Sequence, residues 1–109
     1  MKQYINSKQL KELIPDQFRN LCKLVGDKYH YDHTDEQINK HFQKEYLTMY
    51  ISILERTNIG RMIEILDKDY VLEMTTSEIK IWLRGDIRTS KSYKKELCDS
   101  LWEAVKLIL

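Results

Sequence analysis

Apolar residues recur every three or four positions along most of this chain, which is the spacing of amphipathic helices. Residues 15–26 begin with the only proline, a residue suited to the first helical position, and end at Gly26. Ser7 is predicted to cap a shorter helical turn that precedes residues 15–26. The pattern therefore predicts an N-terminal helical unit and loop over residues 1–33. Its main apolar stripe comprises Phe18, Leu21, Cys22 and Val25.

The longest predicted helix covers residues 35–56. Thr34 and Gln37 have the spacing of a capping box, in which two side chains satisfy backbone N–H groups of the first turn. Additional apolar residues widen the apolar face in the second half, which favours burial on several sides and a central place in the fold. The main stripe comprises Ile38, Phe42, Tyr46, Met49 and Ile53.

Residues 58–109 are predicted to form a helical C-terminal part. A first helix is marked by Met62, Ile63 and Leu66. Its end is less well marked, and Tyr70 continues the same spacing. A long closing helix carries Tyr93, Leu97, Leu101, Trp102, Val105 and Ile108 at three- and four-residue steps.

A short helix is predicted between these two. Thr75 and Glu78 have the spacing of a second capping box, and Gly85 stands where a helix commonly ends in the left-handed conformation. Its buried stripe is predicted to contain Ile79, Trp82 and Leu83.

The predicted fold class is all-α: a compact bundle of five or six helices in one domain, with parts at 1–33, 34–57 and 58–109. Three glycines and one proline in 109 residues are too few for a turn-rich β-sandwich. Cys22 and Cys98 lie on apolar stripes and are predicted to be reduced core residues. The residues predicted to be largely buried are Phe42, Met49, Ile53, Ile79, Leu83, Leu101 and Trp102.

Charge is unevenly distributed along the chain. Residues 78–95 hold six cations and two acids, a net of +4, whereas the whole chain has a net charge of +1. Such segregation suggests a surface for an anionic partner, and the alternative is a chance placement of surface lysines. The six cations are Lys80, Arg84, Arg88, Lys91, Lys94 and Lys95.

The segment T-T-S-E-I-K-I-W-L-R-G-D-I-R-T-S, followed by an amphipathic helix, resembles the recognition helix and next turn of phage-repressor-type helix-turn-helix domains. The resemblance concerns residues 60–105 and implies a transcription-regulator-like protein that binds double-stranded DNA. It implies that Thr76, Ser77, Lys80 and Arg84 face the major groove, and that Arg88, Lys91 and Lys94 contact phosphates.

The loop D-K-Y-H-Y-D-H at residues 27–33 invites comparison with a metal site, because His30, Asp32, His33 and the later His41 all carry potential ligands. Zinc sites need a fixed tetrahedral set, and these spacings match no established one. The loop is therefore predicted to be an aromatic-rich surface, with partner contact as a second option. We predict no metal ion and no cofactor.

Two function classes remain. The chain has neither a glycine-rich phosphate loop nor a serine in a nucleophile elbow, so an enzyme is not predicted. The first class is a DNA-binding protein that uses residues 75–95. The second is a small protein-interaction module, such as a phage or mobile-element adaptor or inhibitor that docks on a host protein.

Location and assembly are predicted from the same pattern. A cytoplasmic protein without membrane contact is expected, since no apolar run could span a bilayer and the start lacks a hydrophobic signal segment. DNA binding by one short helix per half-site would favour a homodimer. Its seam is predicted to use Tyr46, Tyr50 and Ile51, or else residues 107–109.

Overall fold

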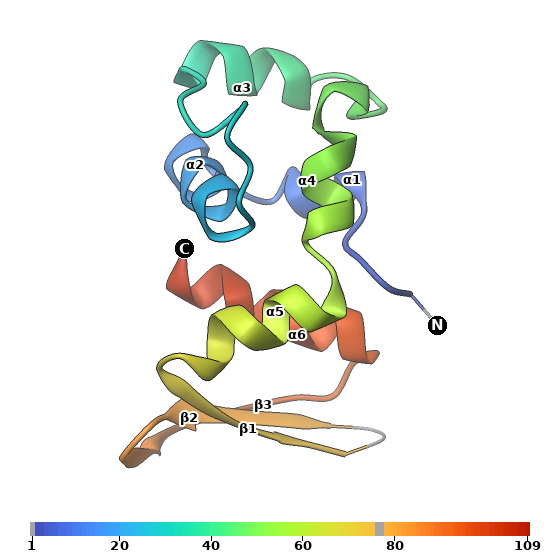
Figure 1. Ribbon diagram of the computed structural model, residues 1–109. Helices are drawn as coiled ribbons and strands as arrows, with labels where there is room; N and C mark the ends of the chain where they lie inside the picture. The colour runs from blue at the N-terminus through green and yellow to red at the C-terminus, as the bar shows by residue number, and fades with distance from the viewer. Residues whose placement is uncertain (1, 76–77) are drawn as a thin grey trace.

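The computed structural model describes residues 2–75 and 78–109. Figure 1 shows three levels: the N-terminal helices at one end, the remaining helices in the middle, and a β-sheet at the other end. The N-terminal helices are α1 (Ser7–Leu10), α2 (Pro15–Leu24), α3 (Asp35–Phe42), the 3-10 helix η1 (Thr48–Tyr50) and α4 (Ile51–Arg56). The remaining elements are α5 (Ile59–Asp67), β1 (Tyr70–Met74), β2 (Ile79–Leu83), β3 (Asp86–Tyr93) and α6 (Leu97–Ile108).

The prediction of an all-α bundle is wrong. Within the described residues, the segment expected to hold a short helix forms a three-stranded antiparallel sheet in the order β1-β2-β3. The helical spacing of Ile79, Trp82 and Leu83 was misleading, because it leaves Ile81 unexplained. On a strand Ile79 and Ile81 share one face, and both are buried. Two β-branched residues two positions apart thus suit a strand, and pairing with both β1 and β3 selects it.

The expected helix caps in this region instead form turns. The Glu78 N–H donates to the Thr75 hydroxyl at 3.1 Å, as a capping box requires, but the Thr75 N–H donates to the Glu78 carbonyl oxygen at 2.9 Å. These two bonds close the β1–β2 hairpin. Gly85 has a φ of +87° and lies in the two-residue connection between β2 and β3, where glycine adopts that angle without steric cost. The expected helix-turn-helix-like unit is therefore absent from the described residues.

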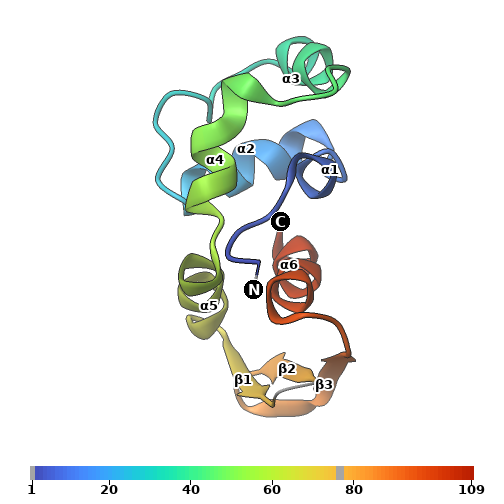
Figure 2. The same ribbon diagram turned by 90° about the vertical axis from the view of Figure 1, so that its right-hand side faces the viewer.

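The two faces of the sheet differ. Leu72 pairs with Ile81 and Met74 with Ile79, and this inner face is covered by α5 and α6 (Figure 2). On the opposite, outer face, Val71 pairs with Trp82 and Glu73 with Lys80. Trp82, expected beside Ile79 in one buried stripe, therefore lies on the other side of the sheet.

The single helix expected over residues 35–56 is also wrong. The Thr34–Gln37 capping box is confirmed, with the Gln37 N–H donating to the Thr34 hydroxyl at 3.2 Å, but α3 ends at Phe42. The Lys11 ammonium group then donates to the carbonyl oxygens of Lys44 and Glu45. Those carbonyls are satisfied from another segment, so the backbone can leave the helix and turn.

The predicted burial of side chains is confirmed only in part. Ile53, Ile79, Leu101 and Trp102 are buried as predicted, and Phe42 is half-buried. Met49 and Leu83 are 50% and 38% exposed, so their predicted burial is wrong. The expected dimer seam fails at Tyr50, which is completely buried, although Tyr46, Ile51 and Leu107 remain exposed.

Most local signals elsewhere are confirmed, but the prediction of Ser7 as the cap of the first turn is wrong, because the Asn6 side chain accepts from the Gln9 N–H and Ser7 is the first residue of α1. Pro15 is the first residue of α2, and Gly26 follows that helix with a φ of +75°. The helix predicted around Met62 is α5, although Tyr70 belongs to β1. Cys22 and Cys98 are free and buried, as predicted.

Candidate functional site

The cations of the basic segment point to different sides of the molecule. Lys80 is exposed on the outer face of the sheet, opposite Glu73. Lys91 pairs with the buried Ile81 and therefore lies on the inner side, beside α6. Lys94 follows the end of β3, whereas Thr76 and Ser77 lie outside the described residues. The arrangement does not give these residues one common surface.

Several of these cations have carboxylate partners. The Arg84 guanidinium donates to the Asp67 carbonyl oxygen at 2.9 Å and lies 3.9 Å from the Asp67 carboxylate. The guanidinium of Arg88 lies 3.2 Å from the carboxylate of Asp86. Lys95 is likewise 3.2 Å from Glu103. The excess of positive charge along the sequence is thus partly compensated in space.

The outer face of the sheet has an apolar centre formed by Val71 and Trp82. Both side chains are partly exposed, and neither packs against the hydrophobic core. Directly opposed residues on antiparallel strands have Cβ atoms about 4.5–5.5 Å apart, so this pair forms one small apolar patch. We call this pair and the adjacent Glu73–Lys80 pair the outer patch.

Mixed charge continues beside the outer patch. The Ser92 hydroxyl donates to the Glu78 carboxylate from the neighbouring strand. That hydrogen bond, assisted by Lys80 and Lys94, lowers the pKa of Glu78 below its usual value. The carboxylate therefore stays charged at neutral pH. The outer patch thus has an apolar centre with charges of both signs around it.

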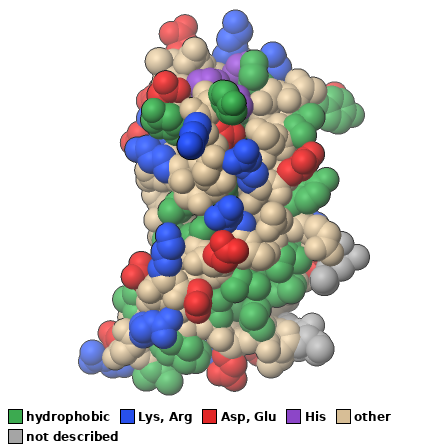
Figure 3. Space-filling model, in the orientation of Figure 1, with side chains coloured by type: hydrophobic (Ala, Val, Ile, Leu, Met, Phe, Trp, Pro, Cys, Tyr) green, Lys and Arg blue, Asp and Glu red, His purple; other side chains and the backbone are tan. Residues whose placement is uncertain are grey.

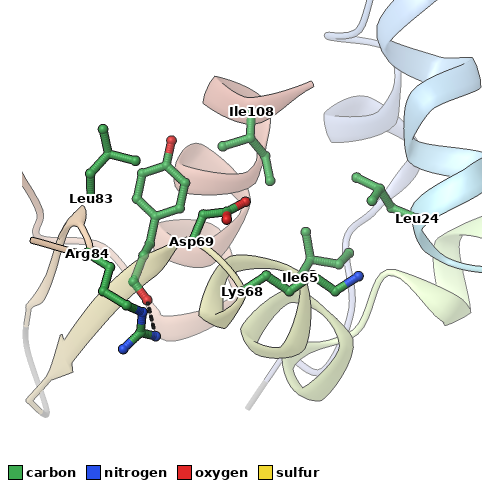
Figure 4. A pocket seen from close by; sticks show the side chains of 8 residues that line it. Leu24, Ile65, Lys68, Asp69, Leu83, Arg84 and Ile108 are labelled. Carbon is green, nitrogen blue, oxygen red and sulfur yellow. Dashed lines mark hydrogen bonds between the residues drawn. The ribbon is translucent and has the colours of Figure 1, made fainter.

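A hollow of about 710 Å³ lies where the sheet meets the helices. Figure 4 shows Leu83 and Arg84 on its sheet side, with Ile65, Ile108 and Leu24 reaching it from three helices. Two cations and one acid stand at its rim, and the Arg84 donors already bind backbone carbonyls. The hollow therefore favours neither a positively nor a negatively charged ligand. Its lining comprises Leu24, Ile65, Lys68, Asp69, Tyr70, Leu83, Arg84 and Ile108.

The three histidines gather around the buried ring of Tyr50, a centre that sequence reasoning missed. The centroids of the His30 and His41 rings each lie 5.2 Å from that of Tyr50. The His33 Nδ1 atom is 3.1 Å from the Tyr50 hydroxyl. Burial raises the pKa of Tyr50 to about 12, so the hydroxyl stays neutral. From the sequence, Tyr50 was predicted only to belong to a dimer seam, and no pattern around it indicated this role.

Asp27 anchors the loop that carries two of these histidines. Its carboxylate is buried and accepts hydrogen bonds from the N–H groups of Tyr29 and His30 at 2.9 and 3.0 Å. It also lies 3.1 Å from the His30 Nδ1 atom and 3.3 Å from the Ser52 hydroxyl. The described residues contain no group of three His, Cys, Asp or Glu side chains arranged to hold a metal ion. The hydrogen bonds of Asp27 and the ring contacts of Tyr50 form a packed polar centre in the N-terminal half.

Acid is expected to destabilise the protein through His33 and His41. Burial lowers both pKa values below 6.5, helped by His30 at His33 and by Lys44 at His41. A lowered folded-state pKa means that the unfolded chain binds protons first, so the stabilisation is present above pH 6.5 and lost as the pH falls through the folded pKa. The melting temperature should therefore drop between pH 7.5 and 5.

The matching control replaces both histidines with glutamine. His33→Gln/His41→Gln should flatten the dependence between pH 7.5 and 5, since glutamine does not titrate. Acid unfolding that stays equally steep in this double variant would assign the effect to other groups.

Comparison with protein-family models, with curated proteins and with solved structures finds no match for this chain. Within residues 2–75 and 78–109, no helix has the length and apolar character needed to cross a membrane. A functional assignment accordingly depends on the surfaces described above.

Proposed function

We propose that this protein is a non-enzymatic protein-interaction module that docks a partner protein on the outer patch. The observation that carries the proposal is Trp82, which lies in mid-sheet, pairs with Val71, and is directed away from the core. Tryptophan is enriched in interface hot spots, and interfaces commonly have an apolar centre with a polar rim. The Glu73–Lys80 pair supplies such a rim.

Electrostatics favours a protein over DNA as the partner. DNA presents about one negative charge per 1.7 Å of duplex, and its binding depends on cations that neutralise phosphates. Here Glu73 and Glu78 flank Lys80, and Arg84 and Arg88 have acidic neighbours. A folded protein with its own mixed charges is a better complement to this surface than a polyanion.

Trp82→Ala is expected to abolish partner recovery while leaving the fold intact. A hot-spot residue contributes at least about 2 kcal/mol, which corresponds to an affinity loss of about 30-fold. The tagged protein would be used to purify its partner from the cells that encode it, with a nuclease-treated sample in parallel. Melting should change little, because Trp82 is not packed against the core.

The matched control is Tyr29→Ala, which removes an aromatic ring that is 82% exposed and belongs to another part of the molecule. One protein that is recovered with the parent chain and with Tyr29→Ala, but not with Trp82→Ala, would support the proposal. Recovery that is equal for all three, or that disappears after nuclease treatment, would contradict it.

A further inference from the structure

The helix layer is wider than the sheet on the side of β1. The described strand β1 is hydrogen-bonded only to β2 in the sheet order, so its other edge carries backbone groups without a strand partner. Figure 2 shows α5 lying farther out than β1 on the side away from β2. Within the described residues, α5 therefore extends past the β1 edge of the sheet, and no strand pairs with that edge.

Apolar side chains lie on β1 and on the part of α5 next to this edge. Leu72 and Met74 lie on the inner face of β1, and Met74 is 45% exposed. On α5, Ile59 and Ile63 lie one turn apart and are only partly buried. The buried stripe of α5 comprises Met62, Ile65 and Leu66. Ile65 is at one side of this stripe and faces the hollow beside α2, whereas Ile59 and Ile63 are at its other side. Figure 3 shows hydrophobic side chains gathered between the middle and lower levels of the molecule.

The two edges of the sheet are protected to different degrees. The β3 edge carries Arg88 and Lys91, and the pairing of β3 with β2 is irregular between Ile81 and Leu83. Both features hinder the addition of another strand. The sequence of β1, Y-V-L-E-M, contains neither lysine nor proline. The β1 edge, which lies next to α5, is therefore less protected against the addition of a strand than the β3 edge.

We propose that β1 accepts an extended segment of the partner protein as a fourth strand beneath α5. The inference rests on the proposed function and specifies how the partner is held. Main-chain hydrogen bonds to β1 would supply affinity, and alternate apolar side chains would contact Leu72, Met74 and Ile63. Residues 61–77 contain four acids and two cations, and Glu73 stands on the outer face of β1. The outward positions of the added strand are therefore expected to be basic.

A second copy of the chain fits this edge less well than a single strand does. Pairing two β1 strands would bring both α5 helices over the same shared edge. Packed helices need axes about 8–10 Å apart, whereas paired strands lie about 4.8 Å apart. An isolated extended segment brings no helix with it and avoids this conflict.

The test uses the capped peptide acetyl-Lys-Val-Lys-Val-Lys-Val-Lys-amide with the isotopically labelled full chain. The N–H groups of alternate residues of a strand point to the same edge, so N-methylation of all valines blocks one edge and N-methylation of all internal lysines blocks the other. The unmodified peptide, at up to about 1 mM, is expected to shift amide resonances of residues 71–74 and of α5. One N-methylated peptide should lose at least about tenfold in affinity, and the other should keep its affinity.

Two variants complete the test. Glu73→Lys should weaken the lysine-rich peptide severalfold by charge repulsion without unfolding the chain, because the side chain is exposed. Tyr29→Ala should leave peptide binding unchanged, since this exposed side chain belongs to another part of the molecule. No shifts at β1, equal binding of both N-methylated peptides, or a dimer in sedimentation that Leu72→Lys dissolves would each overturn the strand-addition proposal. If the peptide binds but Trp82→Ala does not affect partner recovery, the proposal of docking on the outer patch would be rejected, and the proposal of strand addition at β1 would stand.

Discussion

Trp102→Ala is expected to lower the free energy of unfolding by about 3–5 kcal/mol, the usual cost of truncating a large buried aromatic side chain. Trp102 is completely buried on α6, next to the buried Leu101 and near Val105. Small domains have total stabilities of only about 5–15 kcal/mol, so this loss would remove a large fraction of the stability. Urea unfolding at 25 °C, followed by far-ultraviolet circular dichroism, would measure it.

Trp82→Ala is the matched control for this prediction. It removes the same side chain from the outer face of the sheet, where no core contact is lost, and should cost no more than about 1 kcal/mol. Trp102→Phe should cost less than Trp102→Ala, because the indole N–H has no hydrogen-bond partner among the described residues. Equal losses for the two alanine variants would contradict the burial of Trp102 and the two-faced sheet.

Asp27→Ala is expected to cost about 2–4 kcal/mol, an unusually large effect for a loop residue. Hydrogen bonds to a charged acceptor contribute about 1.5–3 kcal/mol each, and deletion leaves the N–H groups of Tyr29 and His30 without their acceptor in a part-buried site. Equilibrium unfolding in urea at pH 7 would measure the loss. Amide exchange of residues 28–33 should increase as well, since the carboxylate holds this loop.

Asp27→Asn and Ser52→Ala are the controls. Asparagine retains one acceptor oxygen and should recover part of the loss, and Ser52 supplies only one hydrogen bond of 3.3 Å. Burial alone would raise the pKa of Asp27, but the hydrogen bonds from His30 and Tyr29 lower it below 3.8. Its contribution should therefore persist to about pH 4 and disappear as the pH falls further. A loss for Ser52→Ala as large as that for Asp27→Ala would argue against the carboxylate as the anchor.

The sequence by itself determined the elements whose signals are local. Pro15 and Gly26 set the bounds of α2, and Thr34 with Gln37 starts α3, because each acts on backbone groups within one turn. The closing helix was predictable from the same periodicity, although it begins at Leu97 rather than near Tyr93. The burial of both cysteines was predictable as well.

The tertiary structure decided the rest. A segment as short as residues 79–83 satisfies the helical and the strand period at once, and only pairing with β1 and β3 beneath α5 and α6 selected the strand. The same pairing placed Lys80 and Lys91 on opposite faces of the sheet and Trp82 on the outer face. The cations that are close together in the sequence therefore do not form one basic surface. The chain turns after Phe42, and in the folded protein the ring of Tyr50 contacts three histidines from other positions in the sequence. Non-local contacts of this kind leave no periodic signal in one sequence, because the partner of each residue lies many positions away.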